Sequence, residues 1–250
     1  MFVLPVNRDR PPESTPAVTI ALMVVNSVIW AGLAFTGANE RVVQHFGLHP
    51  AHLTILTLWT HMFLHAGFWH AAGNMWFLWM FAPKLEERLG HGLFLAMYLL
   101  CGFAAAMLHT LLSPSSMIPM VGASGAISGV AGLYFVLFPR SPFNLVLYFG
   151  WWRLKSLDTL TRGAVGVWIA EQFVLGLITS TVHAAGIAFW AHVGGFACGV
   201  GLGALMASTA TAEEREMIVH PLPLTEEERD EVSADRVEQP SELTTLKLGG

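Results

Sequence analysis

Six apolar segments of the chain approach or reach the length of about 17–25 residues that a helix needs to cross a bilayer. They lie near 17–36, 68–83, 92–112, 122–138, 164–182 and 187–207. The second is the shortest, because Pro83 and a group of charges follow it. Two linking stretches, 37–67 and 143–162, mix tryptophans with polar residues and are predicted to lie partly at the membrane interface. The pattern therefore predicts an all-α integral membrane protein with six transmembrane helices.

Composition agrees with a membrane protein, since 54% of the residues are hydrophobic and only 12% are charged. About 25% charged residues are usual in a soluble domain. The net charge of −5 arises at the C-terminal end, where residues 213–250 carry 11 of the 18 acids and 4 of the 13 bases. The remaining 7 acids and 9 bases leave residues 1–212 at +2, so no nucleic-acid partner is expected.

The division of the chain follows from these patterns. We expect a cytoplasmic N-terminal segment at 1–16, a six-helix domain at 17–207, and an acidic, disordered cytoplasmic tail at 208–250. Basic residues collect on the cytoplasmic side of membrane proteins. With the N-terminus inside, 12 of the 13 Lys and Arg residues fall on the inner side, and only Arg41 falls outside. Six crossings then place both termini inside. The expected location is a bacterial cytoplasmic membrane.

Two reactive side chains stand at the predicted outer ends of the fourth and sixth spans. Ser124 lies in Gly-Ala-Ser-Gly at 122–125, and His192 lies in Ala-His-Val-Gly-Gly at 191–195. Polar groups inside a membrane are costly and usually functional. A hydroxyl beside an imidazole forms an activated nucleophile, with the histidine as general base and later general acid. Glu40 and Glu171 are the only acids on the outer side or within the spans, so the pattern favours a Ser–His dyad.

The outer end of the second span carries a further polar pair, His70 and Asn74. Their i, i+4 spacing places them on one helix face, at the depth predicted for Ser124 and His192. A tetrahedral intermediate needs hydrogen-bond donors for its oxyanion. His70, Asn74 and the backbone around Gly122 and Ala123 are the candidate groups that stabilise the oxyanion or the substrate. No metal ion and no cofactor are expected.

Small residues favour close contact between the fourth and sixth spans. Glycines lie on both spans at intervals of three or four residues, at 125, 129 and 132 and at 195, 199 and 203. Small-xxx-small faces allow two membrane helices to approach closely. We expect this contact to bring Ser124 within hydrogen-bonding distance of His192.

These motifs resemble those of the rhomboid family of intramembrane serine proteases. The family signatures are His-x-x-x-Asn, Gly-x-Ser-x(Gly) and Ala-His-x-x-Gly, which stand here at 70–74, 122–125 and 191–195. The stretches 61–65 and 86–90 are also similar, and the resemblance covers about 15–207. It implies a six-helix rhomboid-like bundle, an endopeptidase that cleaves transmembrane-helix substrates near the outer membrane face, and a catalytic Ser124–His192 dyad. Ser128 stands where many members carry an aromatic residue, and Leu56-Thr57 where others have Trp-Arg.

Alternative interpretations remain open at the level of sequence. The main one is a non-proteolytic rhomboid-like protein that binds transmembrane helices; such relatives typically lack the serine or the histidine. A transporter would need broken helices or repeated halves with midplane charges, and Glu171 is the one such charge in the predicted spans. Glu171 is either a functional intramembrane acid or a packing residue. His61 and His65 are expected to brace the first outer loop through structural hydrogen bonds.

Overall fold

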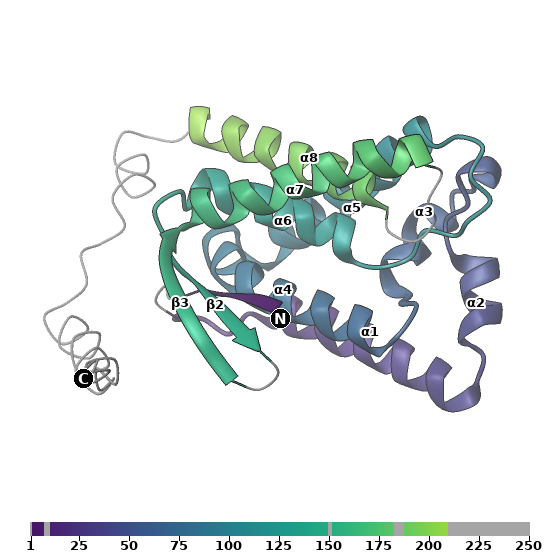
Figure 1. The fold of residues 1–250 in the computed structure, drawn as a ribbon, viewed down its shortest axis with the longest axis horizontal. Coiled ribbons are helices and arrows are strands. Elements are labelled where there is room, and N and C mark those ends of the chain that lie inside the picture. Colours follow the sequence, from purple (N-terminus) through teal and green to yellow (C-terminus); the bar gives the residue numbers. More distant parts are fainter. Residues whose placement is uncertain (1, 8–10, 150–151, 183–187, 210–250) are drawn as a thin grey trace, which may run out of the picture.

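The computed structural model of the protein is mostly helical and describes residues 2–7, 11–149, 152–182 and 188–209 (Figure 1). Its elements, in chain order, are β1 (Phe2–Asn7), α1 (Ala17–Thr36), α2 (Asn39–Phe46), the 3-10 turn η1 (Pro50–His52), α3 (Thr57–Thr60), the 3-10 turn η2 (His61–Phe63), α4 (Phe68–Leu89), α5 (His91–Leu112), α6 (Ser124–Leu137), β2 (Pro142–Phe149), β3 (Trp152–Leu160), α7 (Thr161–Val182) and α8 (Phe189–Thr209). The predicted tail at 208–250 lies outside the described residues from 210 onwards.

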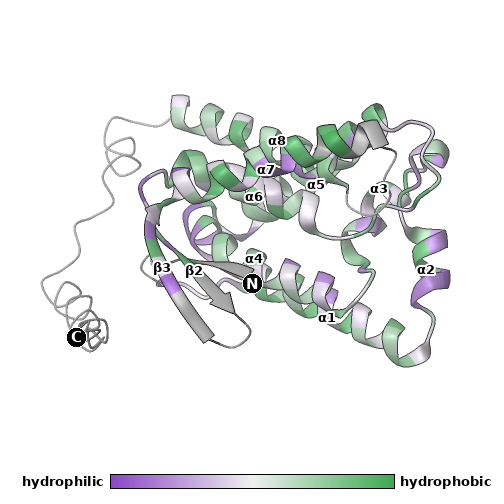
Figure 2. Cartoon of the chain, in the orientation of Figure 1, coloured by the Kyte–Doolittle hydropathy of each residue, from purple (hydrophilic) through white to green (hydrophobic). Residues whose placement is uncertain are grey.

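Among the residues that the structure describes, three helices, α1, α5 and α8, are both long and apolar enough to cross a membrane. Figure 2 shows green, apolar helices between the more hydrophilic α2 at one end and parts of β3 at the other. The predicted first span, 17–36, coincides with α1. The other predicted spans each correspond to one helix, with ends that coincide or differ by at most six residues.

Helix α4 shows the largest such difference, because it continues through Pro83 to Leu89 instead of ending at residue 83. Glu86 is only 1% exposed. Its charge is accommodated there because the carboxylate accepts hydrogen bonds from the start of α1. The amides of Val18 and Thr19 donate over 2.7 and 2.8 Å, and the Thr19 hydroxyl donates over 2.6 Å. Helix α1 has no side-chain cap of its own at Pro16, so α4 supplies the acceptor for its first amides.

A three-stranded antiparallel sheet corrects the expectation of an all-α chain, because the stretch predicted to be interfacial at 143–162 contains two of its strands. Strand β2 lies between β1 and β3, with Leu4 opposite Val146 and Asn144 opposite Asp158. Phe, Val, Leu and Tyr dominate β2, and aromatic and β-branched residues favour strands. Pairing with the distant β1 and with β3 provides backbone partners for β2, while the interfacial location of this stretch stays a prediction.

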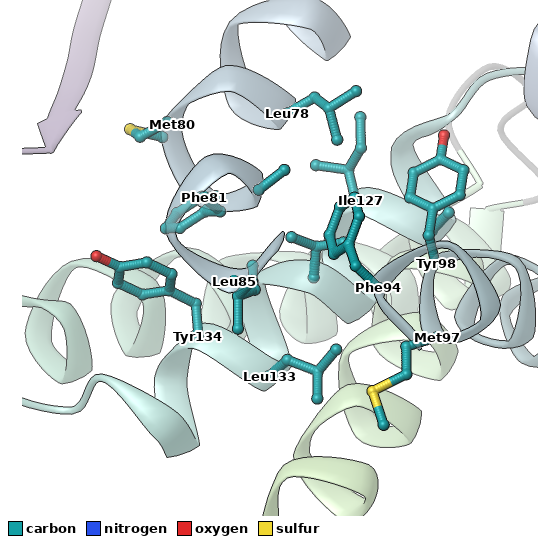
Figure 3. Packing of buried hydrophobic residues seen from close by; sticks show 14 of the residues in the cluster. Leu78, Met80, Phe81, Leu85, Phe94, Met97, Tyr98, Ile127, Leu133 and Tyr134 are labelled. Atoms are coloured by element: carbon teal, nitrogen blue, oxygen red, sulfur yellow. The ribbon is translucent and has the colours of Figure 1, made fainter. Parts of the chain in front are cut away.

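Helix α6 is the centre of the bundle and is buried along most of its length, including every residue from Gly125 to Tyr134. It packs against α4, α5, α7 and α8. Figure 3 shows the apolar cluster in which Ile127, Leu133 and Tyr134 of α6 meet side chains of α4 and α5. A helix buried on all sides is fixed in position, so a side chain at its first residue is placed precisely.

Glycines bring the backbones of α6 and α8 into direct contact, which confirms the packing predicted from their spacing. A Cβ atom added to Gly195 or Gly199 would overlap the carbonyl oxygen of Gly125 or Gly129, respectively. One at Gly132 would overlap the Phe196 carbonyl. The two helices therefore cross at a distance that only glycine permits.

The segment between α1 and α4 is tied to the residues that precede α6. Leu48 and Met120 exchange two backbone hydrogen bonds of 3.0 and 2.8 Å, and the Gly122 amide donates to the His61 carbonyl over 2.9 Å. The His61 ring bonds to the Thr57 carbonyl over 2.9 Å, as expected of a bracing residue. His65 is fully buried but has no hydrogen-bond partner among the described residues, so the bracing role predicted for it is wrong.

The α6–α8 contact predicts opposite effects for two alanine substitutions on α8. Gly199→Ala should lower the free energy of unfolding in detergent by about 1–3 kcal/mol, because the new methyl group collides with backbone. Gly201→Ala, which meets no atom within 4 Å, should be neutral or stabilising by up to about 1 kcal/mol, since alanine favours the helix. Equal effects in thermal or denaturant unfolding would contradict the contact.

The burial of the neutral His65 ring predicts that the protein is less stable in acid. Burial lowers the pKa of His65 from 6.5 to about 4, and repulsion from His70 adds to this effect. The stability that the neutral ring contributes is complete above pH 6.5 and is lost as the pH falls towards 4, because the unfolded chain binds the proton first. Acidification to pH 4 should lower the free energy of unfolding in detergent. We expect this decrease to be about 2–3 kcal/mol smaller in His65→Phe than in the wild type. Measurements at pH 8 provide the control, and parallel pH curves would contradict the prediction.

Candidate active site

Ser124 is the first residue of α6, where the preceding turn is held in an unusual conformation. Gly122 has φ +120°, which L side chains rarely adopt, and a Cβ there would lie 2.7 Å from Nε2 of His70. The first hydrogen bond inside the helix joins the Ile127 amide to the Ala123 carbonyl, so the amides of residues 124–126 precede it. Amides at a helix start favour negative charge nearby.

His192 lies in the first turn of α8 and faces Ser124. Its Nε2 atom is 2.9 Å from the Ser124 hydroxyl oxygen, which is a hydrogen-bond distance. The pair stands beside the Gly125–Gly195 contact, so the close approach of α6 and α8 sets the distance. The structure therefore brings together the two side chains that the sequence proposed as a dyad.

Helix α7 supplies two contacts to the same imidazole that sequence reasoning missed. The Gln172 side-chain oxygen lies 2.7 Å from Nδ1 of His192, and the Trp168 ring lies 6.0 Å from the imidazole at 33°. The Phe189 ring approaches it edge-on at 6.5 Å. Trp168 and Gln172 are four residues apart and thus share a helix face. A glutamine beside Glu171 in a mostly apolar span was the available signal.

Ser128, which departs from the family pattern, takes a different role. Its hydroxyl donates to the Ser124 carbonyl over 2.6 Å, one turn earlier on the same helix. The aromatic neighbour of the histidine comes instead from Trp168 on α7.

His70 and Asn74 lie across the site on α4, together with the turn before Ser124. The Asn74 amide group donates one hydrogen to the His70 carbonyl over 2.9 Å, which leaves its second N–H for another acceptor. Asn74 is 6% exposed, and Ala123 is fully buried. The His70 ring lies against Gly122. The predicted i, i+4 pairing on one helix face is confirmed.

A cavity of about 660 Å³ joins these groups. Its wall includes His70 and Asn74 of α4, Ser124 of α6 and His192 of α8, and most of the remaining lining is apolar. Such pockets, with a few convergent polar groups, are typical of ligand sites. Glu171, left open by the sequence, is exposed and also lines this cavity. Within the described part of the chain, no cluster of three His, Cys, Asp or Glu residues could hold a metal ion.

Comparison with known proteins assigns a family to residues 52–209, which match the Rhomboid domain. Rhomboid protein 1, mitochondrial, of Saccharomyces cerevisiae is 33% identical over 34% of this chain and 26% of its own length. The rhomboid protein YdcA of Bacillus subtilis is 32% identical over 48% of this chain and 61% of its own. RHOMBOID-like protein 1 of Arabidopsis thaliana is 29% identical over 58% and 33%, respectively. The chain thus spans less than two thirds of each relative.

Proposed function

The chain belongs to the rhomboid family, and from this premise we propose that it is an intramembrane serine endopeptidase that cleaves transmembrane helices. The family assignment and the apolar helices make it an integral membrane protein. The observation that carries the proposal is the 2.9 Å contact between the Ser124 hydroxyl and His192 Nε2 in the wall of a cavity. A serine hydroxyl that is hydrogen-bonded to an imidazole and borders a cavity is the arrangement that nucleophilic catalysis requires.

Each catalytic step follows from this pair. Ser124 Oγ forms a bond to the carbonyl carbon of the substrate while its proton passes to His192 Nε2. The tetrahedral intermediate collapses as the C–N bond breaks, and the imidazolium gives its proton to the leaving amine. Water, deprotonated by His192, then attacks the acyl-enzyme ester. The ester C–O bond then breaks as the imidazolium returns its proton to Ser124 Oγ, which releases the new carboxyl end and restores the Ser124 hydroxyl.

The oxyanion of the intermediate lies, in this proposal, between α4 and the start of α6. The free second N–H of Asn74, the His70 ring and the backbone amides that begin with Ser124 are donors on the cavity wall. Gly122, with its positive φ, lines this approach without a side chain, and a Cβ atom there would lie 2.7 Å from His70 Nε2. Fixed donors stabilise charge that develops in the transition state without reorganisation.

Membrane depth supports a cut near one face of the bilayer. The 14 residues of α6 span roughly 21 Å at about 1.5 Å per residue, whereas the hydrocarbon core is about 30 Å thick. With the basic Arg140 end at the inner surface, Ser124 lies about 9 Å below the outer one. We extend the proposal to six crossings by α1, α4, α5, α6, α7 and α8, with both termini inside and a bacterial cytoplasmic membrane as the location.

The position of Ser124 also indicates which features a substrate helix needs. A helical substrate hides its carbonyls in hydrogen bonds, so Ser124 requires a stretch that opens into an extended form. Glycine, proline or serine near the outer end of a substrate helix would lower the cost of opening it. The small residues around Ser124 leave space for a small side chain before the cut. No charged specificity pocket is proposed.

The dyad can be tested with a fluorophosphonate probe that forms a covalent bond with activated serines. We expect the purified full chain in detergent to be labelled, and Ser124→Ala to lose labelling. His192→Ala should slow labelling and substrate cleavage by about 10³-fold or more. The double variant should be no worse than either single one, because the residues act as a unit.

Ser208→Ala, which removes a hydroxyl at the far end of α8, is the matched control and should be labelled normally. Thermal unfolding would show that each variant is folded. Cleavage of a membrane substrate by folded Ser124→Ala would contradict the protease proposal. A wild-type protein that binds transmembrane helices but is neither labelled nor able to cut them would instead be a non-proteolytic rhomboid-like protein.

The oxyanion proposal predicts a selective loss for substitutions on α4. Asn74→Ala should lower kcat by about 10²–10³-fold with little change in KM, because the donor acts on the transition state. His70→Ala should behave similarly. Trp79→Leu, on an exposed part of α4, is the control and should cleave at the wild-type rate. An unchanged kcat in both single variants would reassign the pair to helix packing.

A further inference from the structure

We propose that Gln172 is a positioning residue that fixes the tautomer and orientation of His192, in the place where soluble serine proteases use a carboxylate. The inference rests on the proposed function and deepens it. Its central observation is the 2.7 Å contact between the Gln172 side-chain oxygen and Nδ1 of His192, on the opposite side of the ring from Ser124.

The tautomer follows from the atoms that meet. An amide oxygen can only accept a hydrogen bond, so Nδ1 of His192 must carry the hydrogen. In a neutral imidazole Nε2 then has no hydrogen and is free to accept the Ser124 proton. The reverse tautomer would place an N–H against the hydroxyl and leave no base. Gln172 therefore selects the state in which the pair can react.

The same hydrogen bond serves the charged state of the reaction. When His192 has taken the serine proton, both ring nitrogens are donors. Nε2–H then points towards the leaving group, and Nδ1–H still donates to Gln172. Hydrogen bonds with a charged partner are stronger than neutral ones, so the contact strengthens as the charge develops. It thereby favours the transition state over the ground state.

The surroundings explain why a neutral acceptor suits this position. Gln172 is 8% exposed on a helix that is otherwise mostly apolar. A carboxylate here would carry a desolvated charge through the resting state, which is expensive within membrane-like surroundings. The amide provides an acceptor without that charge. Its burial is also compensated, because its oxygen is hydrogen-bonded.

Trp168 completes the support from the same helix. Its ring lies 6.0 Å from the imidazole between centroids, with 33° between the two planes, while Gln172 contacts Nδ1 at the ring edge. One turn of α7 thus restricts both the tilt and the in-plane rotation of His192. Glu171 borders the cavity next in sequence but makes no hydrogen bond to the imidazole among the described residues.

Nitrogen-15 NMR of histidine-labelled full-length protein tests the inference without any substrate. The His192 signals are identified by their loss in His192→Ala. We expect Nδ1 to be protonated and Nε2 to be bare in the wild type, and a mixture of tautomers in Gln172→Leu. Gln172→Glu, which keeps an acceptor of the same length, should retain the wild-type tautomer. A wild-type signal with the proton on Nε2, or a Gln172→Leu spectrum like the wild type, would overturn the assignment.

Steady-state kinetics of substrate cleavage provide the second test of the role of Gln172. Gln172→Leu should lower kcat about 10–100-fold with KM changed by no more than about twofold, and Gln172→Glu should recover most of the loss. Val174→Ala, an exposed position on the same helix, is the matched control. If Gln172→Leu does not fold, Gln172→Met preserves the length of the side chain. An unchanged kcat in a folded variant would overturn the role. A wild type that cleaves nothing would remove the proposed function, while the NMR result would still decide the Gln172 contact.

Discussion

The direct contact between the backbones of α6 and α8 is the constraint on which the rest of the structure depends. Apolar side chains give little specificity between helices in lipid, because lipid tails are equally apolar. Glycines on both helices instead allow dispersion contacts over the whole crossing. Ser124 and His192 flank that crossing, so their separation is set by the best-packed part of the molecule rather than by a loop.

The other parts of the site are attached to this frame in different ways. The turn at Gly122 is held by backbone bonds to the segment between α1 and α4, and it fits against the His70 ring. Helix α7 contributes Gln172 and Trp168, while large apolar side chains such as Val167 and Val174 remain exposed on it. The nucleophile is thus placed by the centre of the bundle, and the base is oriented by a helix at its periphery.

Sequence alone predicted the residues whose role depends on local spacing. Ser124 and His192 sit in short motifs of small residues at helix starts, and His70 and Asn74 are one turn apart, so each could be placed on its own helix. Gln172 could not be assigned, because α7 is apolar around most of its circumference and its rotation is fixed only by packing. Trp168 was missed for the same reason.

The sheet and the end of α4 were missed because both depend on partners far away in the chain. Strand β2 reads as an interfacial segment until β1 is placed beside it. Glu86 looks like the boundary of a span until its carboxylate is found at the amides of Val18 and Thr19. Charge and hydrophobic periodicity indicate which residues of a segment face water or an apolar environment. They carry no information about a partner more than 60 residues away.

The pairing of β1 with β2 imposes an order on biosynthesis. The first strand emerges from the ribosome about 140 residues before the strand that it joins. During that interval its backbone groups must remain hydrated, and the loop that finally closes contains α1 through α6. Closing so long a loop is entropically costly and slow. The sheet therefore cannot form before β2 has been synthesised, by which time α1 through α6 already lie between its first two strands.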